Sequence, residues 1–210
     1  VVGVRSTSGS IKCDKVLIAA GTWSREIGRL ANVNIPIQAA HHQYMVSEKI
    51  EGISGTMPAL RDPDRQTYFK EEVGGLVCGG YEFNPIAHLH RPAIDDEEYK
   101  LYPEEFDHFE QFIPSLMERF PGLSNVGIKQ WFNGLEAFTE DTYFILGEAP
   151  EVRNVFVSCG YNAMGIAAGG GAGMAIAHWM INGEPPFDLW PVDIRRFSQL
   201  HRSDNSVLRR

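Results

Sequence analysis

The sequence HHQY at positions 41–44 places two imidazoles, an amide and a phenol on consecutive residues, a set that could orient a polar substrate. The surrounding pattern is typical of a strand, on which successive side chains point to opposite faces. His42 and Tyr44 should therefore share one face, with His41 and Gln43 on the other. We expect no metal site here, because adjacent strand residues diverge and no carboxylate or thiol follows at ligand spacing. A polar strand edge is the alternative reading.

A second stretch, CGYNAMGIAAGGGAG at 159–173, joins an aromatic–amide loop to a glycine-rich helix pattern. It is not a dinucleotide fingerprint, because Asn162 stands where G-x-G-x-x-G needs glycine. It is not a phosphate-binding P-loop either, because Ile166 follows Gly165 where that motif has lysine. A helix that begins near Gly165 would still direct backbone N–H groups and the positive end of its dipole at a ligand beyond the preceding strand.

The glycines inside this helix pattern need a reason, since each destabilises a helix by about 1 kcal/mol relative to alanine. We expect the small residues of 167–173 to allow close packing against a sheet or another helix. Residues 160–166 are then the part that faces a ligand. The helical glycines are Gly169, Gly170, Gly171 and Gly173.

Other candidate groups favour structural roles. His88 and His90 share a strand face and could bind a metal, but the prolines around them indicate a surface connection. Cys159 at a strand end is expected to be a buried structural thiol. The acidic run at 95–98 suits the start of a helix. No Ser-His-Asp arrangement, G-x-S-x-G elbow or carboxylate pair stands out, and such a sequence fits an enzyme whose cofactor performs the difficult step.

Composition excludes several classes of protein. The 210 residues are 43% hydrophobic and 22% charged, which is ordinary for a globular domain or two. A net charge of −8 without a basic stripe argues against a nucleic-acid partner. No apolar run predicts a membrane span or signal peptide, and three scattered cysteines favour a reducing intracellular compartment. Because the chain opens without Met inside a strand pattern, we expect a segment of a longer protein.

Periodicity and turn residues predict the elements that position these groups. Ser24 is the expected N-cap of the first helix, and Pro114 predicts a kink or two abutting helices within 94–120. We expect a hairpin over 1–12, strands over 16–20, 35–50, 68–69, 74–82, 126–138 and 154–160, and helices over 24–30, 94–120 and 165–182.

Four segments in this order resemble the FAD-dependent amine oxidoreductases of the D-amino-acid-oxidase superfamily. They are VLIAAGTWSREIG at 16–28, HHQYMVSE at 41–48, the run from NGLEAFT through GYNAMGI at 133–166, and INGEPPFDLWPVDIRRF at 181–197. The chain is most similar to the dimethylglycine and sarcosine dehydrogenases, with the pyruvate dehydrogenase phosphatase regulatory subunit as a relative. The resemblance covers nearly the whole chain. It departs at 140–142, where relatives carry P-D-G and this chain has E-D-T, which weakens any ligand contact there.

The resemblance implies a fold and a set of site residues. It implies part of an FAD-binding Rossmann-like α/β domain, residues 1–40 and 139–210, plus a substrate domain with a mainly antiparallel sheet, residues 41–138. Tyr44 would lie at the substrate site, and His42 shares its face. The implied FAD contacts are Ala20, Gly21, Thr22, Trp23, Gly160, Tyr161, Asn162, Ala163, Met164, Gly165 and Ile166.

The implied activity is oxidation of an N-methylated glycine by hydride transfer to flavin N5, by a dehydrogenase rather than an oxidase. The partner is a small-molecule amine, with no nucleic acid and no membrane. Tetrahydrofolate would enter through a C-terminal domain absent from this chain. The protein would be cytoplasmic in a bacterium or reside in the mitochondrial matrix of a eukaryote. The alternative is a non-catalytic regulatory subunit on the same fold.

Overall fold

A computed structural model describes residues 1–88 and 100–198. The chain divides into two compact units. Unit 1 comprises residues 1–40, 87–96 and 136–210, and unit 2 comprises 41–86 and 97–135. The roles of cofactor and substrate domain remain predictions for these units. Two long strands, β4 (Ile37–Ser47) and β8 (Ile128–Thr139), contribute residues to both.

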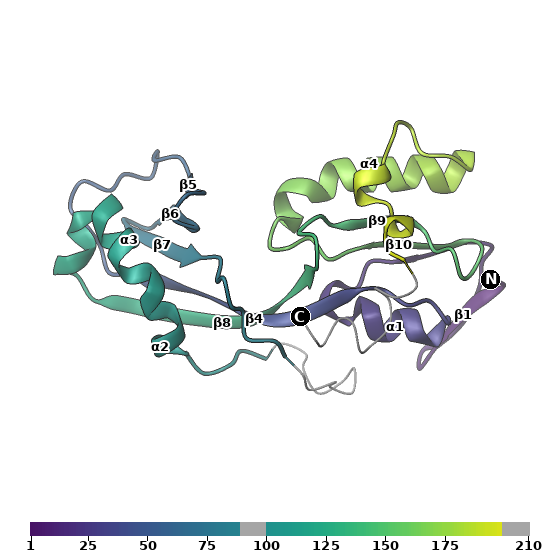
Figure 1. Ribbon diagram of the computed structural model, residues 1–210, viewed down its shortest axis with the longest axis horizontal. Coiled ribbons are helices and arrows are strands. Elements are labelled where there is room, and N and C mark those ends of the chain that lie inside the picture. Colours follow the sequence, from purple (N-terminus) through teal and green to yellow (C-terminus); the bar gives the residue numbers. More distant parts are fainter. Residues whose placement is uncertain (89–99, 199–210) are drawn as a thin grey trace. The chain divides into compact units, whose positions relative to one another are not determined.

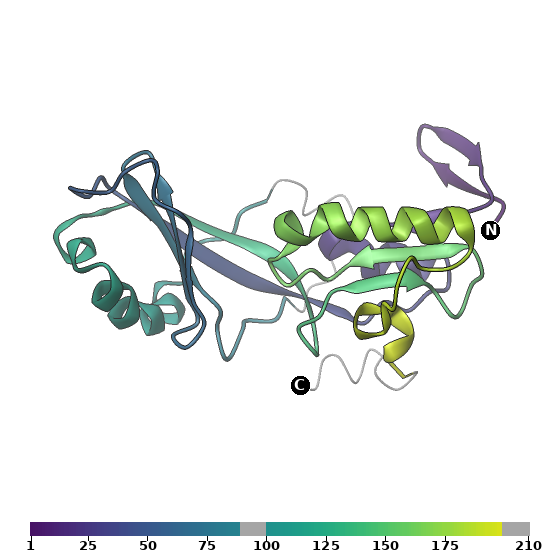
Figure 2. The same cartoon turned by 90° about the horizontal axis from the view of Figure 1, so that it is seen from above.

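Unit 1 is built on a three-stranded sheet in the order β3-β10-β9. Strand β10 (Val155–Cys159) is parallel to β3 (Val16–Ile18) and antiparallel to β9 (Ile145–Glu148). Figure 1 shows helix α4 (Gly165–Asn182) along one face of this sheet and α1 (Ser24–Leu30) on the other. A separate hairpin of β1 (Gly3–Ser6) and β2 (Gly9–Lys12) lies near the N-terminus in Figure 2. Short 3-10 turns occupy Gly21–Trp23, Trp190–Val192 and Ile194–Arg196.

Strand alternation gives unit 1 two apolar layers. Phe156 and Leu146 pack with Ala172, Ile176 and Trp179 of helix α4. The opposite face carries the larger cluster, because alternate residues of β9 and β10 point the other way. That cluster is Ile18, Val33, Ile35, Ile37, Ala137, Ile145, Ala149, Val155, Val157, Cys159, Ile194 and Phe197.

Unit 2 holds a sheet in the order β5-β6-β7-β4-β8. Strands β5 (Leu60–Asp62), β6 (Thr67–Glu72), β7 (Gly75–Gly80) and β4 pair antiparallel. The short helices α2 (Phe106–Phe109) and α3 (Ile113–Arg119), with 3-10 turns at Glu110–Phe112 and Pro121–Asn125, cover one face (Figure 2). The apolar cluster between them is Met45, Phe69, Leu76, Cys78, Phe109, Phe112, Leu116 and Leu123. The expected mixed fold with a mainly antiparallel second sheet is confirmed.

Two local expectations were inaccurate. Ser24 is the first residue of α1 and not its N-cap; the cap position is Trp23, and the Ser24 hydroxyl accepts a hydrogen bond from the Ala20 N–H. The helix expected over 94–120 starts only at Phe106 in its described part, while the two abutting helices that Pro114 allowed are present as α2 and α3. Pro114 lies in the first turn of α3, where its missing N–H costs no helical hydrogen bond. The acidic run at 95–98 lies outside the described residues.

The close packing expected at the α4 glycines is absent among the described residues. Beyond the surrounding backbone of α4 itself, a Cβ built on Gly169, Gly170, Gly171 or Gly173 would meet no atom of residues 1–88 or 100–198 within 4 Å. The helix instead packs through Ala172, Ala175, Ile176 and Trp179. The reason expected for these glycines was therefore wrong for this part of the chain.

The open space around Gly170 predicts how an alanine there changes the stability of the chain. Gly170→Ala should raise the free energy of unfolding of the 210-residue chain by about 1 kcal/mol, because alanine is the better helix former and meets no neighbour. Urea unfolding followed by circular dichroism measures the change. The matched control is Gly147→Ala, which should destabilise, because Gly147 has φ +128° and its Cβ would lie 2.9 Å from the Trp179 ring. A destabilising Gly170→Ala would mean that this helix face is packed.

Candidate functional site

The parallel pair β3–β10 brings two predicted segments to one edge of the sheet. Ile18 and Val157 are register partners, so both strands end at the same edge. Residues 20–23 follow β3 as a 3-10 turn leading into α1, and residues 160–164 follow β10 as the loop leading into α4. In α/β sheets, ligands bind beyond the carboxyl ends of parallel strands. The two sets of residues predicted to contact a cofactor are thus neighbours, and the contact itself stays a prediction.

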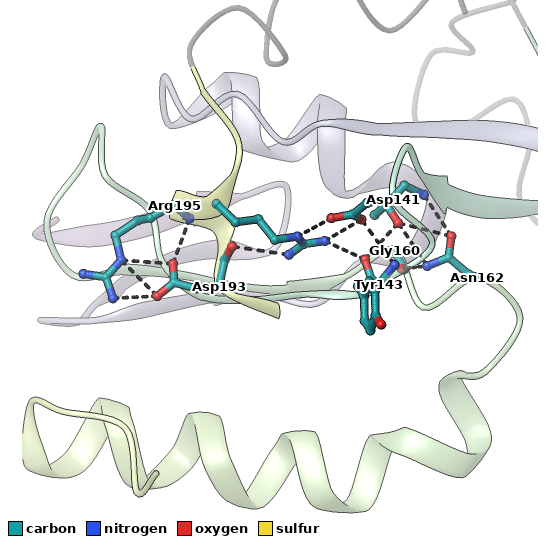
Figure 3. Close-up of polar contacts among 8 residues, drawn as sticks. Asp141, Tyr143, Gly160, Asn162, Asp193 and Arg195 are labelled. Carbon is teal, nitrogen blue, oxygen red and sulfur yellow. Dashed lines mark hydrogen bonds and ion pairs between the residues drawn. The ribbon is translucent and has the colours of Figure 1, made fainter. Parts of the chain in front are cut away.

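The loop after β10 has an unusual backbone that its own side chains hold in place. Gly160, Asn162 and Ala163 all have positive φ (64°, 53° and 61°), which is unfavourable for the last two. The Asn162 side chain donates a hydrogen bond to the Gly160 carbonyl (2.7 Å; Figure 3). It also accepts from the Thr139 N–H (2.9 Å) and donates to the Thr139 hydroxyl (3.1 Å). With 7% exposure, the Asn162 side chain ties the loop to β8, and a contact of this residue with a cofactor stays a prediction.

Tyr161 is also committed to packing. Its hydroxyl lies 2.6 Å from the Ser158 hydroxyl, and its ring stacks on Phe144 with centroids 4.9 Å apart. Burial raises the pKa of Tyr161, so the phenol stays neutral. The parts of this loop left to meet a ligand are the backbone and the following helix, and not the aromatic or amide groups that first drew attention to it.

Helix α4 begins at this loop without a side-chain cap. Its N-cap is Met164, whose side chain makes no capping hydrogen bond. Ile166 in the first turn is fully exposed, at 104%. The helix has 18 residues, so the positive end of a full-length dipole is presented at the edge defined by β3 and β10. A Cβ at Gly165 would make only an ordinary contact with Tyr161, at 3.5 Å.

Asp141 has a structural partner. Its carboxylate accepts hydrogen bonds from Arg196 Nε (2.6 Å) and Nη2 (2.9 Å), and Arg196 also donates to the Tyr143 carbonyl (2.6 Å). Burial alone would raise the pKa of Asp141, but the Arg196 pair outweighs it and holds that pKa below its usual value. Figure 3 shows the same C-terminal turn held by the Asp193–Arg195 pair. The sequence indicated that a ligand contact at 140–142 is weakened, and the bidentate bond from Arg196 already occupies the Asp141 carboxylate.

In unit 2, one row of side chains crosses four strands on the sheet face away from α2 and α3. The register places Arg61, Tyr68, Gly79 and Tyr44 opposite one another on β5, β6, β7 and β4. The row needs a glycine, because a Cβ at position 79 would overlap the phenol of Tyr68. Tyr44 stacks on Phe132 with centroids 4.8 Å apart.

Burial raises the pKa of Tyr44, with Glu72 adding to the increase and Lys70 opposing it. Burial also raises the pKa of Tyr68 far above its usual value, and Tyr81 and Glu82 add to it. Both phenols therefore stay protonated at neutral pH and can donate hydrogen bonds. Tyr44 lies on the predicted strand and shares a sheet face with His42, and its role at a substrate site stays a prediction. Tyr68, Tyr81 and Phe132 were missed, although the glycine in the GGYE run was a usable signal.

The two adjacent histidines point to opposite faces, as expected. The His41 Nδ1 lies 3.4 Å from Glu105 Oε1 on the helix side, where Gln43 also bonds to the Glu105 backbone. The His42 Nδ1 lies 3.5 Å from Glu82 Oε2, and its ring centroid is 5.2 Å from that of Tyr81. His42 therefore shares the face of Tyr44. Strand alternation was sufficient to predict this division.

The remaining candidates behave as structural groups. Burial raises the pKa of Cys159 to about 12, against a smaller lowering by Ser24, and its exposure is 1%. All three cysteines are free thiols. Within residues 1–88 and 100–198 no cluster of three metal-ligating side chains occurs, and His90 lies outside that range. No described helix has the length and apolarity to cross a membrane.

A parallel-strand edge beside the N-terminus of a long helix, in a chain that also holds an antiparallel sheet, is the kind of edge at which α/β proteins bind ligands. The chain belongs to the FAD dependent oxidoreductase family, whose model matches residues 1–179.

Named relatives match most of the chain. Mouse mitochondrial sarcosine dehydrogenase is 41% identical over 197 residues, which is 94% of this chain and 21% of the relative. The mouse pyruvate dehydrogenase phosphatase regulatory subunit is 35% identical over 97% of the chain and 23% of its own length. Rat dimethylglycine dehydrogenase is 30% identical over 93% of the chain and 24% of its own length. The chain thus spans less than a quarter of each of these relatives.

A solved structure supports the fold. The L-proline dehydrogenase of P. horikoshii superposes with a TM-score of 0.76 over 93% of this chain and 50% of that chain, at 22% identity. The residues present fit FAD in one respect that the structure carries: the edge beyond β3 and β10 presents the uncapped N-terminus of α4. A phosphate, or a ring system that gains negative charge on reduction, is the kind of group such a terminus favours.

Asn162 should be a stability determinant. Asn162→Ala removes the bonds to Thr139 and Gly160 and leaves a non-glycine residue at positive φ without its support. We expect a loss of about 2–3 kcal/mol in the free energy of unfolding, measured by urea denaturation. Asn182→Ala, which removes one exposed hydrogen bond to the His178 carbonyl, is the matched control and should change it by less than about 0.5 kcal/mol. Equal effects would show that Asn162 does not fix the loop.

Proposed function

We propose that the full-length protein oxidises an N-methylated glycine of the dimethylglycine or sarcosine type. A hydride would leave the N-methyl carbon for flavin N5, and the resulting iminium would be hydrolysed or its one-carbon unit passed to tetrahydrofolate on a further domain. FAD, when bound, supplies the two-electron acceptor. Family membership supports a flavin, and the names of two relatives support an N-methyl substrate.

The observation that carries the substrate class is the aromatic row of unit 2. This aromatic row consists of two ring pairs, Tyr44 stacked on Phe132 and Tyr68 edge-on to Tyr81, and strand register brings Tyr44 and Tyr68 together across Gly79. A methylated ammonium is a large, weakly hydrated cation that aromatic faces attract. The protonated phenols add hydrogen-bond donors for a carboxylate. In this proposal Tyr44 orients the substrate and His42 is a second polar contact.

In unit 1, residues 20–23 and 160–166 would hold the flavin. The first turn of α4 would place its N–H groups against the ring system, where a positive dipole end favours the negative charge that builds up on reduction. The loop side chains Tyr161 and Asn162 would act indirectly, by keeping this backbone rigid. A substitution that changes the loop geometry would then slow flavin reduction, even though every backbone N–H group is still present.

The second candidate is a regulatory subunit without catalysis, which the 35% identity to the phosphatase regulatory subunit favours. The localisation follows from the source: the mitochondrial matrix for a eukaryotic protein and the cytoplasm for a bacterial one. The partners proposed are a small-molecule amine and an unassigned electron acceptor, with no nucleic acid or membrane.

Anaerobic mixing of the FAD-loaded full-length protein with dimethylglycine or sarcosine tests the function. We expect the absorbance of the oxidised flavin to bleach after mixing. Betaine is the matched control, since its quaternary nitrogen has no lone pair to expel a hydride, and it should leave the spectrum oxidised. If no N-methyl amine bleaches a fully loaded flavin, the regulatory alternative is favoured. Hydrogen peroxide release in air would identify an oxidase.

The aromatic row can be tested at Tyr44. Tyr44→Leu removes the ring that stacks on Phe132 and should weaken substrate binding about 10-fold, the size of a partly desolvated cation–π contact. The dissociation constant from the concentration dependence of flavin reduction measures this. Tyr44→Phe keeps the ring and should remain within about 3-fold of the native protein. If both variants bind alike, the ring is not a recognition element.

A further inference from the structure

Helix α4 carries no charged side chain on any face. None of its 18 residues is Asp, Glu, Lys or Arg, and its polar side chains, His178 and Asn182, lie near the C-terminal end. One side of the helix packs on the sheet, with Trp179 buried. The opposite side is exposed and includes Ile166, Gly170, Met174 and Ile181. A helix that is apolar all round is normally buried, so the outer side of α4 needs a partner.

Strand β3 is the edge strand of the sheet that α4 covers. Within residues 1–88 and 100–198, no strand pairs with its outer edge. The Val16 N–H donates to the Asn154 carbonyl (3.0 Å), on the side of β10. Because successive N–H groups of a strand point to opposite sides, the Leu17 N–H is directed at the open edge.

The Leu17 side chain marks the same opening. Leu17 is the register partner of Phe156, which packs against α4, so both side chains lie on the α4 face of the sheet. Phe156 is 2% exposed, whereas Leu17 is 38% exposed. Helix α4 therefore covers β10 more completely than β3. Parallel strands are normally buried on both faces by helices, so β3 has room for a further helix beside α4.

The β1–β2 hairpin also lacks support. Its register pairs Val4 with Ile11, and both side chains are exposed. A two-stranded hairpin is marginally stable in water unless it packs on another element. Because this hairpin leads directly into β3, its apolar pair belongs to the same open side of unit 1.

The other end of the sheet is occupied by the C-terminal part of the chain. Asp193 forms a parallel bridge to Leu146 of β9. Ile194 and Phe197 pack in the apolar cluster on the face away from α4. The open end is thus the one that the chain enters from its N-terminal side. Since the chain spans less than a quarter of the named relatives, a full-length protein has further polypeptide to place there.

We propose that the outer side of α4 and the open edge of β3 dock a segment of the full-length protein that precedes Val1. This segment adds a strand beside Leu17 and a helix against the glycine side of α4. Glycines there let two helix backbones approach closely, which accounts for residues that otherwise weaken the helix. The docking goes beyond the proposed oxidation and holds for any substrate, because it concerns the scaffold of unit 1 alone.

Amide hydrogen exchange tests the β3 edge without turnover. The ratio of the Leu17 exchange rate to the Val16 rate should be about 100-fold lower in the full-length protein than in the 210-residue chain, because a new strand accepts the Leu17 N–H. Val16 is the internal control, since its bond to Asn154 is present in both. Mass spectrometry with electron-transfer fragmentation resolves the two amides. An unchanged ratio would overturn the proposal, and a low ratio in both chains that varies with protein concentration would assign the surface to a second copy.

Substitution at Gly170 tests the α4 side. Gly170→Ala is expected to stabilise the 210-residue chain, but in the full-length protein the sign should reverse. Gly170→Leu should lower the thermal midpoint of the full-length protein by about 5 °C through overpacking and leave that of the 210-residue chain unlowered.

The matched control is Gly55→Ala in unit 2, where the new Cβ would meet only the tip of Glu71, at 4.0 Å. It should shift both chains alike. Equal effects of Gly170→Leu on the two chains would show that nothing covers α4 in the full-length protein. If Gly170→Leu does not fold, the exchange ratio of the native protein still decides the outcome.

Discussion

The parallel pairing of β3 with β10 is the constraint on which the candidate cofactor edge depends. These short strands lie far apart in sequence, yet their register ends both at one edge. That arrangement brings 20–23 beside 160–166 and points the start of α4 beyond the sheet. The apolar layers on both faces of the sheet stabilise this arrangement, since Val155, Val157 and Phe156 are each nearly fully buried.

In unit 2, the absence of a side chain at Gly79 lets Tyr68 lie across β7 toward Tyr44. The other sheet face is filled by the helices, and Tyr44, Tyr68 and Tyr81 lie on the face away from them. The same alternation separates His41 from His42 and gives each a different carboxylate. One sheet thus carries a packed core and a chemically distinct face, which is a general property of antiparallel sheets.

Much of this could be predicted because periodicity is local. Helix α1, the strand holding HHQY, the β10–loop–α4 unit and the separation of His42 from His41 all follow from spacing and alternation. The sequence also predicted that a loop after β10 leads into a helix that begins near Gly165. The structural role of the loop side chain Asn162 could not be predicted, because its bonds run to Thr139, which is 23 residues away. No spacing rule within the loop contains that partner.

The sequence by itself determined the family, the mixed fold and the residues that could face a ligand, since each depends on short motifs and on which face of an element a side chain occupies. Only the tertiary structure decided which of these residues are engaged. It committed Asn162, Tyr161 and Asp141 to the scaffold, left the α4 glycines open among the described residues, and buried Glu82 beside His42. The physical reason is that burial and hydrogen-bond partners are long-range properties, set when distant strands pair.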